Sequence, residues 1–295
     1  MVMGEFTQET ELLVMGGGPG GYAAAFRAAD LGLDVTMVDS GGRPGGVCLF
    51  RGCIPSKTLL YASELIHDGR RAKEMGITFG EPKINLDQLR QWKGQVIEKL
   101  ANGLMTLSNK RGIQLVKGTA RFEGSDQVHL EGEDVEISRF KFRHAIIATG
   151  SEPISLPGIS FKPGSRIMDS TGALGLTDIP GKLLVVGGGY VGVELGSVYA
   201  SLGSRVTVVE MADRLMVGAD PDLAKPLRKE LEKRFEAIFC NTKVKTLEEK
   251  EEGVSVLLEG DVPEPQQVFD RVLVAIGRRP NSKDIGLEKT KVQVN

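Results

Sequence analysis

The sequence predicts an α/β protein in which one strand–turn–helix–strand unit occurs twice, once in each of two domains. At 295 residues the chain is long enough for two domains of about 100–200 residues each. Two glycine-rich turns, Gly16–Gly21 and Gly187–Gly192, each follow a short apolar run and precede a helical pattern. Weakly alternating segments with turn residues come after each unit, so short antiparallel β meanders are expected beside the parallel sheets.

The first unit begins with the apolar run Glu11 to Met15, which reads as a buried strand. An alanine-rich helix follows the turn, and a second apolar strand ends at Asp39. Strand, G-x-G-x-x-G, helix, strand and acid form the context in which this motif indicates a dinucleotide site. Gly16 permits the tight turn, Gly18 lets the backbone approach a pyrophosphate, and Gly21 lets helix and strand pack closely. The helix N-terminus would bind the phosphates, and Asp39 a ribose hydroxyl.

The second unit repeats the landmarks of the first at one constant offset. Its turn, helix stop and terminal acid are Gly187, Gly189, Gly192, Gly203 and Glu210. A single G-x-G-x-x-G is weak evidence, but two complete units in identical register, each with a terminal acid, are strong evidence. Two unrelated glycine-rich turns do not explain this spacing. The fold class is therefore predicted to be two Rossmann-like dinucleotide-binding domains with parallel sheets.

A long helix is expected between the two units. Asn85 and Gln88 can cap it, and apolar residues then recur at helical spacing. This stripe consists of Leu86, Leu89, Trp92, Val96, Leu100, Leu104 and Leu107. Residues 113–137 are expected to form short antiparallel strands. Residues 153–163, rich in proline and glycine, read as the crossing between domains.

Composition and charge exclude several classes of protein. A formal net charge of −2 and a pI near 6.1 argue against non-specific nucleic-acid binding. The acidic N-terminal segment has no apolar core of a signal peptide, and no apolar run approaches the ~18 residues of a membrane span. Three cysteines, an odd number, fit a reducing compartment. The sequence predicts a soluble, cytoplasmic protein with no nucleic-acid or membrane partner.

The segment Gly45 to Lys57 reads GGVCLFRGCIPSK and places Cys48 and Cys53 five positions apart. Pro55 fits the first turn of a helix, because its missing N–H costs nothing there. Cys53 would then lie at a helix N-terminus, where partial positive charge favours a thiolate. Two close cysteines so placed indicate a redox pair.

A C-x4-C motif alone more often means two buried thiols or half of a metal site. A zinc site needs about four ligands, and the remaining candidates in this chain are not at ligand spacing. These candidates are Cys240, His67, His129 and His144. No metal site is therefore predicted.

Together these segments resemble the pyridine nucleotide–disulfide oxidoreductases, most closely the members that oxidise dihydrolipoamide. The resemblance covers the chain from about Leu12 to Asn295. It rests on GGGPGGYAAA, GGVCLFRGCIPSK, IIATGS, GGGYVGVELG, VVE at Val208–Glu210, and AIGRRPN. It implies an FAD-binding domain with a redox disulfide in residues 1–155 and an NAD-binding domain in residues 156–284. Residues 285–295 would begin the return to the first domain.

The resemblance implies that dihydrolipoamide reduces the disulfide, electrons pass to FAD, and hydride leaves to NAD. Cys48 would be the interchange thiol that reacts with the dithiol substrate, and Cys53 the thiol that faces the flavin. Lys57 would approach the flavin N5 region and pair with Glu194. A physical argument supports the order of the cofactors: the dithiol must touch the cofactor it reduces, and it follows shortly after Asp39. The implied partners are the lipoyl domain of a 2-oxo acid dehydrogenase complex and, in the full-length family, a second identical subunit.

The cofactor-binding residues that the resemblance implies fall into two groups. Those in the first half are Gly16, Gly18, Pro19, Gly20, Gly21, Asp39, Ser40, Gly46, Val47, Lys57, Gly118, Thr149, Gly150 and Ser151. Those in the second half are Gly187, Gly189, Tyr190, Val191, Gly192, Glu210, Val244, Ala275, Gly277 and Arg278.

Glu210 favours NAD over NADP, because a carboxylate accepts a hydrogen bond from the ribose 2′-OH and repels a 2′-phosphate. Arg214 nearby would favour NADP, but the carboxylate of Glu210 is the stronger indication of NAD. Tyr190 could cover the nicotinamide face or simply pack.

The family pattern continues beyond what this sequence contains. It normally holds a second flavin motif, an apolar strand ending in Gly-Asp, and a dimerisation domain with a catalytic His–Glu pair. Gly260-Asp261 precedes the AIGRRPN strand, and none of the three histidines has a glutamate five positions later. We therefore expect a partial chain with impaired turnover of dihydrolipoamide, since such a base contributes about 10²–10⁴-fold.

Two alternative functions stay open. One is an enzyme similar to glutathione reductase or mercuric reductase, which a substrate panel with both nucleotides would reveal. The other is a non-catalytic dinucleotide-binding fragment, which would show no flavin colour and no response to reduction.

Overall fold

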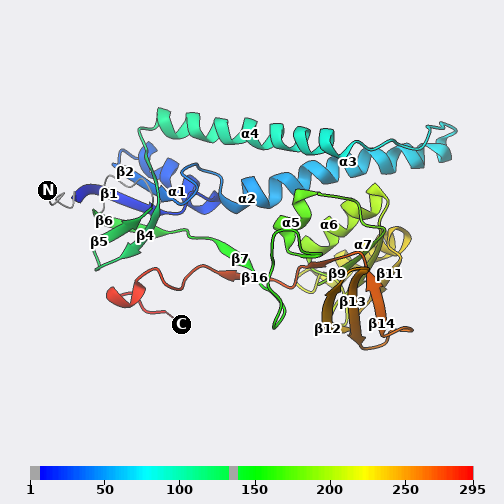
Figure 1. The fold of residues 1–295 in the computed structure, drawn as a ribbon. Coiled ribbons are helices and arrows are strands. Elements are labelled where there is room, and N and C mark those ends of the chain that lie inside the picture. Colours follow the sequence, from blue (N-terminus) through cyan, green and yellow to red (C-terminus); the bar gives the residue numbers. More distant parts are fainter. Residues whose placement is uncertain (1–6, 133–138, 295) are drawn as a thin grey trace. The chain divides into compact units, whose positions relative to one another are not determined.

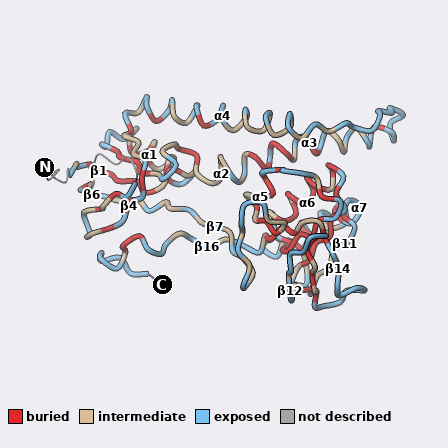
Figure 2. The backbone as a smooth tube through the Cα atoms, viewed as in Figure 1, coloured by how far each residue is buried: buried red, intermediate tan, exposed pale blue. Residues whose placement is uncertain are grey.

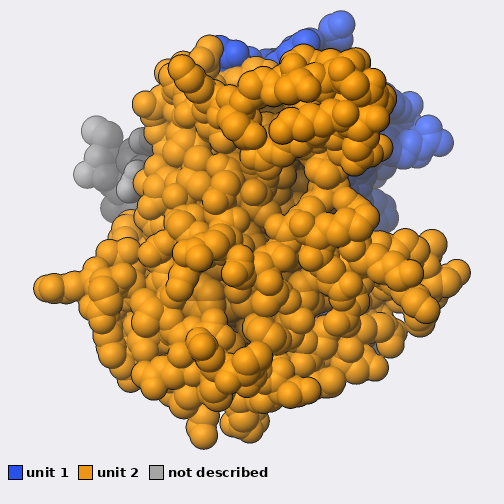
Figure 3. All heavy atoms as spheres, turned by 90° about the vertical axis from the view of Figure 1, so that its right-hand side faces the viewer, with its two compact units in different colours: residues 1–53, 95–152, 280–295 blue, residues 54–94, 153–279 orange. Residues whose placement is uncertain are grey.

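The computed structural model describes residues 7–132 and 139–294, which divide into two compact units (Figures 1 and 3). Unit 1 comprises residues 1–53, 95–152 and 280–295, and unit 2 comprises residues 54–94 and 153–279. The crossing after residue 152 lies close to the boundary expected after residue 155. Residues 54–94, by contrast, group with unit 2 because Leu59 packs into the core of that unit. Which cofactor each unit binds stays a prediction.

Unit 1 contains a six-stranded sheet in the order β3-β2-β1-β6-β5-β4 (Figure 1). Its strands are β1 (Thr7–Met15), β2 (Val35–Asp39), β3 (Gln114–Lys117), β4 (Thr119–Phe122), β5 (Gln127–Glu131) and β6 (Arg139–Ile147). Strands β3, β2, β1 and β6 are neighbours and run parallel to one another. Strand β5 pairs antiparallel with β6, and β4 pairs antiparallel with β5. The expectation of antiparallel strands after residue 113 is therefore wrong for β3. The long helix before β3 forms a crossover, and such a connection joins parallel strands.

Helices cover this sheet and alternate side chains fill both of its faces. The helices are α1 (Pro19–Asp30), α2 (Gly46–Arg51) and the C-terminal part of α4 (Leu86–Lys110). Leu12 and Val14 pack with Ala25 of α1, whereas Leu13 packs on the opposite side with Phe140. A strand buried on both faces explains the continuous apolar run before the first glycine turn.

Unit 2 contains a five-stranded parallel sheet in the order β11-β10-β9-β15-β8 and a three-stranded antiparallel sheet, β12-β13-β14. The parallel strands are β8 (Ile167–Met168), β9 (Lys182–Val186), β10 (Arg205–Val209), β11 (Ala237–Phe239) and β15 (Arg271–Val274). The meander consists of β12 (Lys243–Lys250), β13 (Gly253–Glu259) and β14 (Gln266–Phe269). These two sheets match the parallel-plus-meander architecture predicted for the second half.

The helices of unit 2 are α3 (Cys53–Arg71, from Ile54 onward), α5 (Ser170–Gly175), α6 (Tyr190–Leu202), α7 (Pro221–Arg234), the start of α4 and the 3₁₀ helix η1 (Ala72–Met75). The remaining short elements of the chain are β7 (Ser151–Pro153), β16 (Arg278–Pro280) and the 3₁₀ helix η2 (Leu287–Lys289).

Buried residues follow the strands of the six-stranded and five-stranded sheets, whereas α4 is mostly exposed or half-buried, with Ala101 and Ser108 as its buried residues (Figure 2). Asn85 caps α4 as expected, since its side chain accepts a hydrogen bond from the Gln88 N–H at 3.1 Å. Its apolar stripe is less buried than the spacing suggests: Leu100 is 43% exposed and Leu107 is 42% exposed. No helix among the described residues is both long and apolar enough to cross a membrane.

Candidate active site

The first glycine-rich turn, in unit 1, is closed so tightly that only glycine fits. Gly16 has φ +104°, and a Cβ there would lie 2.2 Å from the carbonyl oxygen of Ala148. A Cβ at Gly21 would lie 1.8 Å from the carbonyl oxygen of Gly16. Helix α1 starts at Pro19 after the N-cap Gly18, and among the described residues no side chain caps it. Its first N–H groups can therefore receive a phosphate.

Asp39 holds this turn from the end of β2. One carboxylate oxygen accepts the Gly17 N–H at 2.8 Å, and the other accepts the Gly41 N–H at 2.8 Å. The Gly118 N–H donates to the Asp39 carbonyl oxygen at 3.1 Å, which brings this predicted residue to the same edge of the sheet. The acid therefore fixes the turn, and its remaining lone pairs can accept from a ribose hydroxyl.

The predicted flavin residues Thr149, Gly150 and Ser151 follow β6 at the same edge. The Thr149 hydroxyl donates to the Asn281 carbonyl oxygen at 2.7 Å, and the Asn281 side-chain amide donates back to the Thr149 carbonyl oxygen at 2.9 Å. The Asn281 N–H donates to the Gly150 carbonyl oxygen at 2.9 Å. The chain thus returns to unit 1 at Pro280, a few residues earlier than the sequence suggested.

Residues 45–53 contain both cysteines and are called the redox segment here after their predicted role; their first residues fold directly onto the first glycine turn. The Gly45 N–H donates to the Gly17 carbonyl oxygen at 2.7 Å, and a Cβ at Gly46 would lie 2.5 Å from the Gly18 Cα. Two predicted cofactor residues, Gly46 and Val47, begin helix α2 at this contact. The segment that carries the cysteines is therefore fixed beside the turn at the start of α1.

Cys48 and Cys53 lie on consecutive helices of this segment. Cys48 is half-buried on α2, and Cys53 is exposed as the first residue of α3, with Pro55 in its first turn. The predicted placement of Cys53 at a helix N-terminus is confirmed. Gly52 separates the two helices, and a Cβ there would come within 3.0 Å of the Val47 carbonyl oxygen.

Lys57 and Glu194 form an ion pair in unit 2, as the resemblance implied. The Lys57 ammonium lies 2.5 Å from one oxygen of the Glu194 carboxylate, and the Ser56 hydroxyl donates to the other at 3.3 Å. Lys57 is one turn beyond Cys53 on α3, and Glu194 is one turn beyond Tyr190 on α6. The sequence did not single out Ser56, whose position beside Lys57 was its only signal.

The second glycine-rich turn, in unit 2, reproduces the first. Gly187 has φ +108°, and a Cβ there would lie 2.3 Å from the Ala275 carbonyl oxygen. A Cβ at Gly192 would lie 2.1 Å from the Gly187 carbonyl oxygen. Glu210 accepts the Gly188 N–H at 2.6 Å with one oxygen and the Ala212 N–H at 2.8 Å with the other. The constant offset in the sequence therefore corresponds to one geometry built twice.

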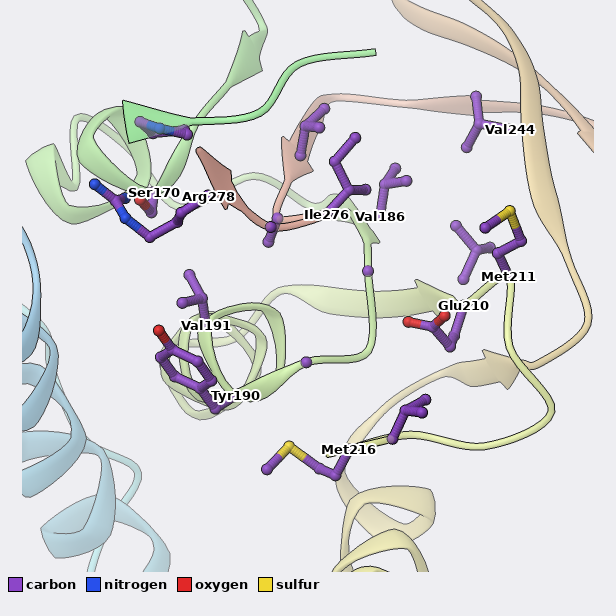
Figure 4. Close-up of a pocket in the computed structure, with 18 of the residues that line it drawn as sticks. Ser170, Val186, Tyr190, Val191, Glu210, Met211, Met216, Val244, Ile276 and Arg278 are labelled. Carbon is purple, nitrogen blue, oxygen red and sulfur yellow. The ribbon is translucent and has the colours of Figure 1, made fainter. Parts of the chain in front are cut away.

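A cavity of about 910 Å³ opens at this second turn, wholly within unit 2 (Figure 4). The predicted residues of the second half line it, apart from Gly192, which lies against Gly187. They are Gly187, Gly189, Tyr190, Val191, Glu210, Val244, Ala275, Gly277 and Arg278. Tyr190 is 61% exposed at the start of α6, and the Glu210 carboxylate lies at the end of β10 (Figure 4).

Sequence reasoning missed several residues of this cavity. They include Ser170, Met211, Met216, Thr242, Lys243 and Ile276. Met211 and Ile276 adjoin predicted residues and could have been found from the motifs. Met216 and Ser170 come from a loop and from α5, so only the fold brings them to the cavity.

Cys240 stands apart from the redox segment. It lies at the end of β11, and the Arg228 guanidinium donates to its sulfur at 3.5 Å. Burial raises the pKa of the Cys240 thiol despite that neighbouring charge. Within residues 7–132 and 139–294, no three His, Cys, Asp or Glu side chains gather closely enough to hold a metal ion.

Comparisons with known proteins agree with this geometry. The family model "Pyridine nucleotide-disulphide oxidoreductase" matches residues 10–295. A dihydrolipoyl dehydrogenase of Vibrio cholerae is 44% identical over 97% of this chain and 60% of its own length. One of Geobacillus stearothermophilus is 43% identical over 100% of this chain and 62% of its own. The chain thus spans roughly three-fifths of these relatives.

Solved structures are also similar to this chain over nearly all of its length. The crystal structure of LpdA from Mycobacterium tuberculosis has a TM-score of 0.86 at 27% identity, over 97% of this chain and 62% of its own. A flavoprotein disulfide reductase of Escherichia coli, RclA, has a TM-score of 0.77 at 28% identity, over 97% and 60%. The chain belongs to the pyridine nucleotide–disulphide oxidoreductase family.

Proposed function

We propose that this chain carries the nucleotide-binding and disulfide parts of a flavoprotein that oxidises dihydrolipoamide to lipoamide, with FAD held by unit 1 and NAD by unit 2. The observation that carries the proposal is the docking of the redox segment on the first glycine turn through Gly45 and Gly46. It fixes a pair of cysteines beside the first dinucleotide turn, and a dithiol must touch the cofactor that it reduces. The names of the relatives, dihydrolipoyl dehydrogenases, support the choice of substrate.

The residues present fit two dinucleotides, and members of this family use FAD and NAD. Each unit has a glycine cradle that a Cβ would fill, an N-terminus without a side-chain cap and an acid at the turn. In unit 1, Gly16, Gly18 and Asp39 would hold FAD. In unit 2, Gly187 and Glu210 would hold NAD, with the 910 Å³ cavity for the rest of the molecule.

The cysteine chemistry conserves atoms and electrons. One thiolate of dihydrolipoamide attacks the sulfur of Cys48, which breaks the Cys48–Cys53 bond and forms a mixed disulfide. The second substrate thiolate then displaces Cys48, so that lipoamide leaves and the protein holds two thiols. FAD held by Gly16, Gly18 and Asp39 would supply the acceptor for the electron pair of that dithiol, and NAD held by Gly187 and Glu210 would supply the final hydride acceptor. Cys53 at the N-terminus of α3 is placed where a thiolate is favoured.

Lys57 and Glu194 have a supporting role in this proposal. A cation stabilises neighbouring anions, and the 2.5 Å contact with Glu194 fixes the direction of the ammonium. In this proposal the Lys57 ammonium approaches the flavin, and Glu194 holds the Lys57 side chain in place. The wider partners, a lipoyl domain and a second identical subunit, and a cytoplasmic location are proposed by likeness to the bacterial relatives.

The test is stoichiometric transfer of electrons from the reduced protein. The chain is reduced, freed of reductant and mixed with oxidised lipoamide or oxidised glutathione in separate reactions. Cysteine-containing peptides are then quantified by mass spectrometry. We expect lipoamide to re-form the Cys48–Cys53 disulfide fastest. Faster disulfide formation with oxidised glutathione would reject the dihydrolipoamide assignment, and failure to form this disulfide at all would reject the redox role.

A further inference from the structure

The loop that leads from Asp39 to the redox helix α2 consists largely of glycine. Residues 41–46 read Gly-Gly-Arg-Pro-Gly-Gly, and three of these glycines have positive φ: Gly42 at +67°, Gly45 at +138° and Gly46 at +56°. Glycine has the greatest conformational freedom to lose when a chain is ordered. Such a loop needs anchors if it is to hold Cys48 in one place.

Arg43 supplies such an anchor, because its side chain is the longest in this stretch and binds α4. Its guanidinium donates to both carboxylate oxygens of Glu98, at 2.9 and 3.3 Å, and to the Asn102 side-chain oxygen at 3.3 Å. The planar fork of arginine suits this two-point contact, and a lysine ammonium cannot reproduce it.

The same guanidinium also lies over the ring of Phe50, 5.7 Å from the ring centre, within the range of a cation–π contact. Phe50 is on α2, between Cys48 and Cys53 in the sequence. The loop packs closely on this helix, since a Cβ at Gly45 would lie 2.9 Å from the Phe50 ring and 2.4 Å from Leu49. Arg43 therefore ties α4 to the helix that carries the first cysteine.

We propose that Arg43 is a positioning residue for the Cys48–Cys53 pair: by tying the glycine loop and Phe50 to α4, it keeps the two sulfurs ready to form a disulfide. The inference rests on the proposed redox function of this pair. An exposed ion pair alone contributes little to stability, and the Glu98 carboxylate is 56% exposed. The expected effect is therefore on the ease of disulfide formation and only weakly on folding.

The experiment measures the disulfide equilibrium of the chain against glutathione. The protein dithiol and one glutathione disulfide give the protein disulfide and two glutathione thiols, which take up the two thiol protons. Trapped samples at a series of glutathione ratios are analysed by mass spectrometry of the peptides with Cys48 and Cys53. Arg43→Lys is the decisive variant, because it keeps the positive charge and loses the fork. Arg43→Met removes both.

Arg111 offers a matched control in the same unit. Its guanidinium binds Asp30 at 2.9 and 3.4 Å and lies 4.8 Å from the centre of the Phe26 ring. The contact joins the end of α4 to α1, away from the cysteine segment. Arg111→Lys therefore makes the same chemical change without touching the glycine loop, and thermal melting of each variant reports any general loss of stability.

We expect Arg43→Lys to lower the equilibrium constant for disulfide formation by about tenfold, a shift of about 30 mV for this two-electron couple. Arg111→Lys should leave it unchanged. An unchanged constant in Arg43→Lys, or equal shifts in both variants, would overturn the role of Arg43 and leave the proposed function standing. If the unaltered chain forms no Cys48–Cys53 disulfide, both the proposed function and this inference are rejected.

Discussion

Glu210 is tied into the second glycine turn by both of its carboxylate oxygens. Gly188 donates at 2.6 Å and Ala212 at 2.8 Å. A residue whose expected task was to bind a ribose therefore also shapes the turn that would bind the pyrophosphate. Its replacement should affect both tasks, because an amide cannot accept from two backbone N–H groups with one oxygen in this geometry.

We predict that Glu210→Gln weakens NAD binding by about tenfold, the loss of one hydrogen bond to a charged group. Repulsion of a 2′-phosphate also falls, so the ratio of NADP to NAD affinity should rise. Isothermal titration with both nucleotides measures this. Asp213→Asn is the control, since Asp213 is a 71% exposed acid whose ion pair is with Arg214 at 3.9 Å. An unchanged affinity ratio in Glu210→Gln would refute the assignment of Glu210 to nucleotide selection.

The Lys57–Glu194 pair should matter more to redox chemistry than to stability. The Lys57 side chain is 61% exposed and that of Glu194 is 26% exposed, so water still screens the pair, and such a pair contributes about 0–1 kcal/mol. We predict that Glu194→Gln changes the free energy of unfolding by less than about 1 kcal/mol. It should nevertheless slow reduction of the FAD-loaded protein by dihydrolipoamide. Chemical denaturation and stopped-flow absorbance measure the two effects; Glu232→Gln, which breaks the Arg228 pair on α7, is the control. A large loss of stability with normal reduction would contradict this assignment.

Cys240 should behave as an unreactive cysteine. Burial raises the pKa of its thiol, so a smaller fraction is thiolate at a given pH and the nucleophile is scarcer. We predict slow alkylation of Cys240 at pH 7 and a rise in rate only above the ordinary range of a thiol pKa. Mass spectrometry of the iodoacetamide-treated, reduced protein follows each cysteine separately. Rapid labelling of Cys240 at neutral pH would show that the packing around β11 is not as the structure has it.

At the scale of elements, two neighbouring glycines of α1 provide a direct test of the first turn. A Cβ at Gly21 would lie 1.8 Å from a backbone oxygen, whereas one at Gly20 would meet open space among the described residues. We predict that Gly21→Ala costs about 1–3 kcal/mol of stability and weakens FAD retention. Gly20→Ala should be neutral or stabilising by up to about 1 kcal/mol. Thermal and denaturant unfolding compare the two. Equal losses in both variants would contradict the close helix–strand contact.

The glycine turns, their strands and the two acids could be predicted because each depends on local requirements: positive φ, close backbone approach and a capping carboxylate. The direction of β3 could not, because it depends on a crossover through α4 and not on its own alternation. The stripe of α4 predicted a helix correctly, but spacing alone could not show that Leu100 and Leu107 are largely exposed.

For the candidate site, too, only some of the residues could be predicted from the sequence. Cys48, Cys53 and Glu210 are recognisable by residue type and spacing. Arg43 and Ser170 are not, because Arg43 binds Glu98, which is distant in sequence, and Ser170 lines the cavity only because the fold brings it there. A pattern of residues identifies the groups that react more readily than the groups that hold them.

At the scale of the whole molecule, the chain combines two dinucleotide-binding units with one redox segment. The likeness to dihydrolipoyl dehydrogenases extends over nearly all of this chain and over about 60% of those relatives. The repeated geometry of the two turns supports two different nucleotides in one protein. The docking of the cysteine segment on the first turn supports the proposal that unit 1 holds the flavin.

The most direct test of this account is the absorbance spectrum of the FAD-loaded chain during anaerobic reduction by one equivalent of dithiol. The account predicts a yellow protein that gains a long-wavelength band, because the proposed function would place the Cys53 thiolate next to the flavin. Cys53→Ser should lose this band and Cys240→Ser should keep it. A chain that retains no FAD, or a band that persists in Cys53→Ser, would contradict the central claim that unit 1 holds a flavin against this redox pair.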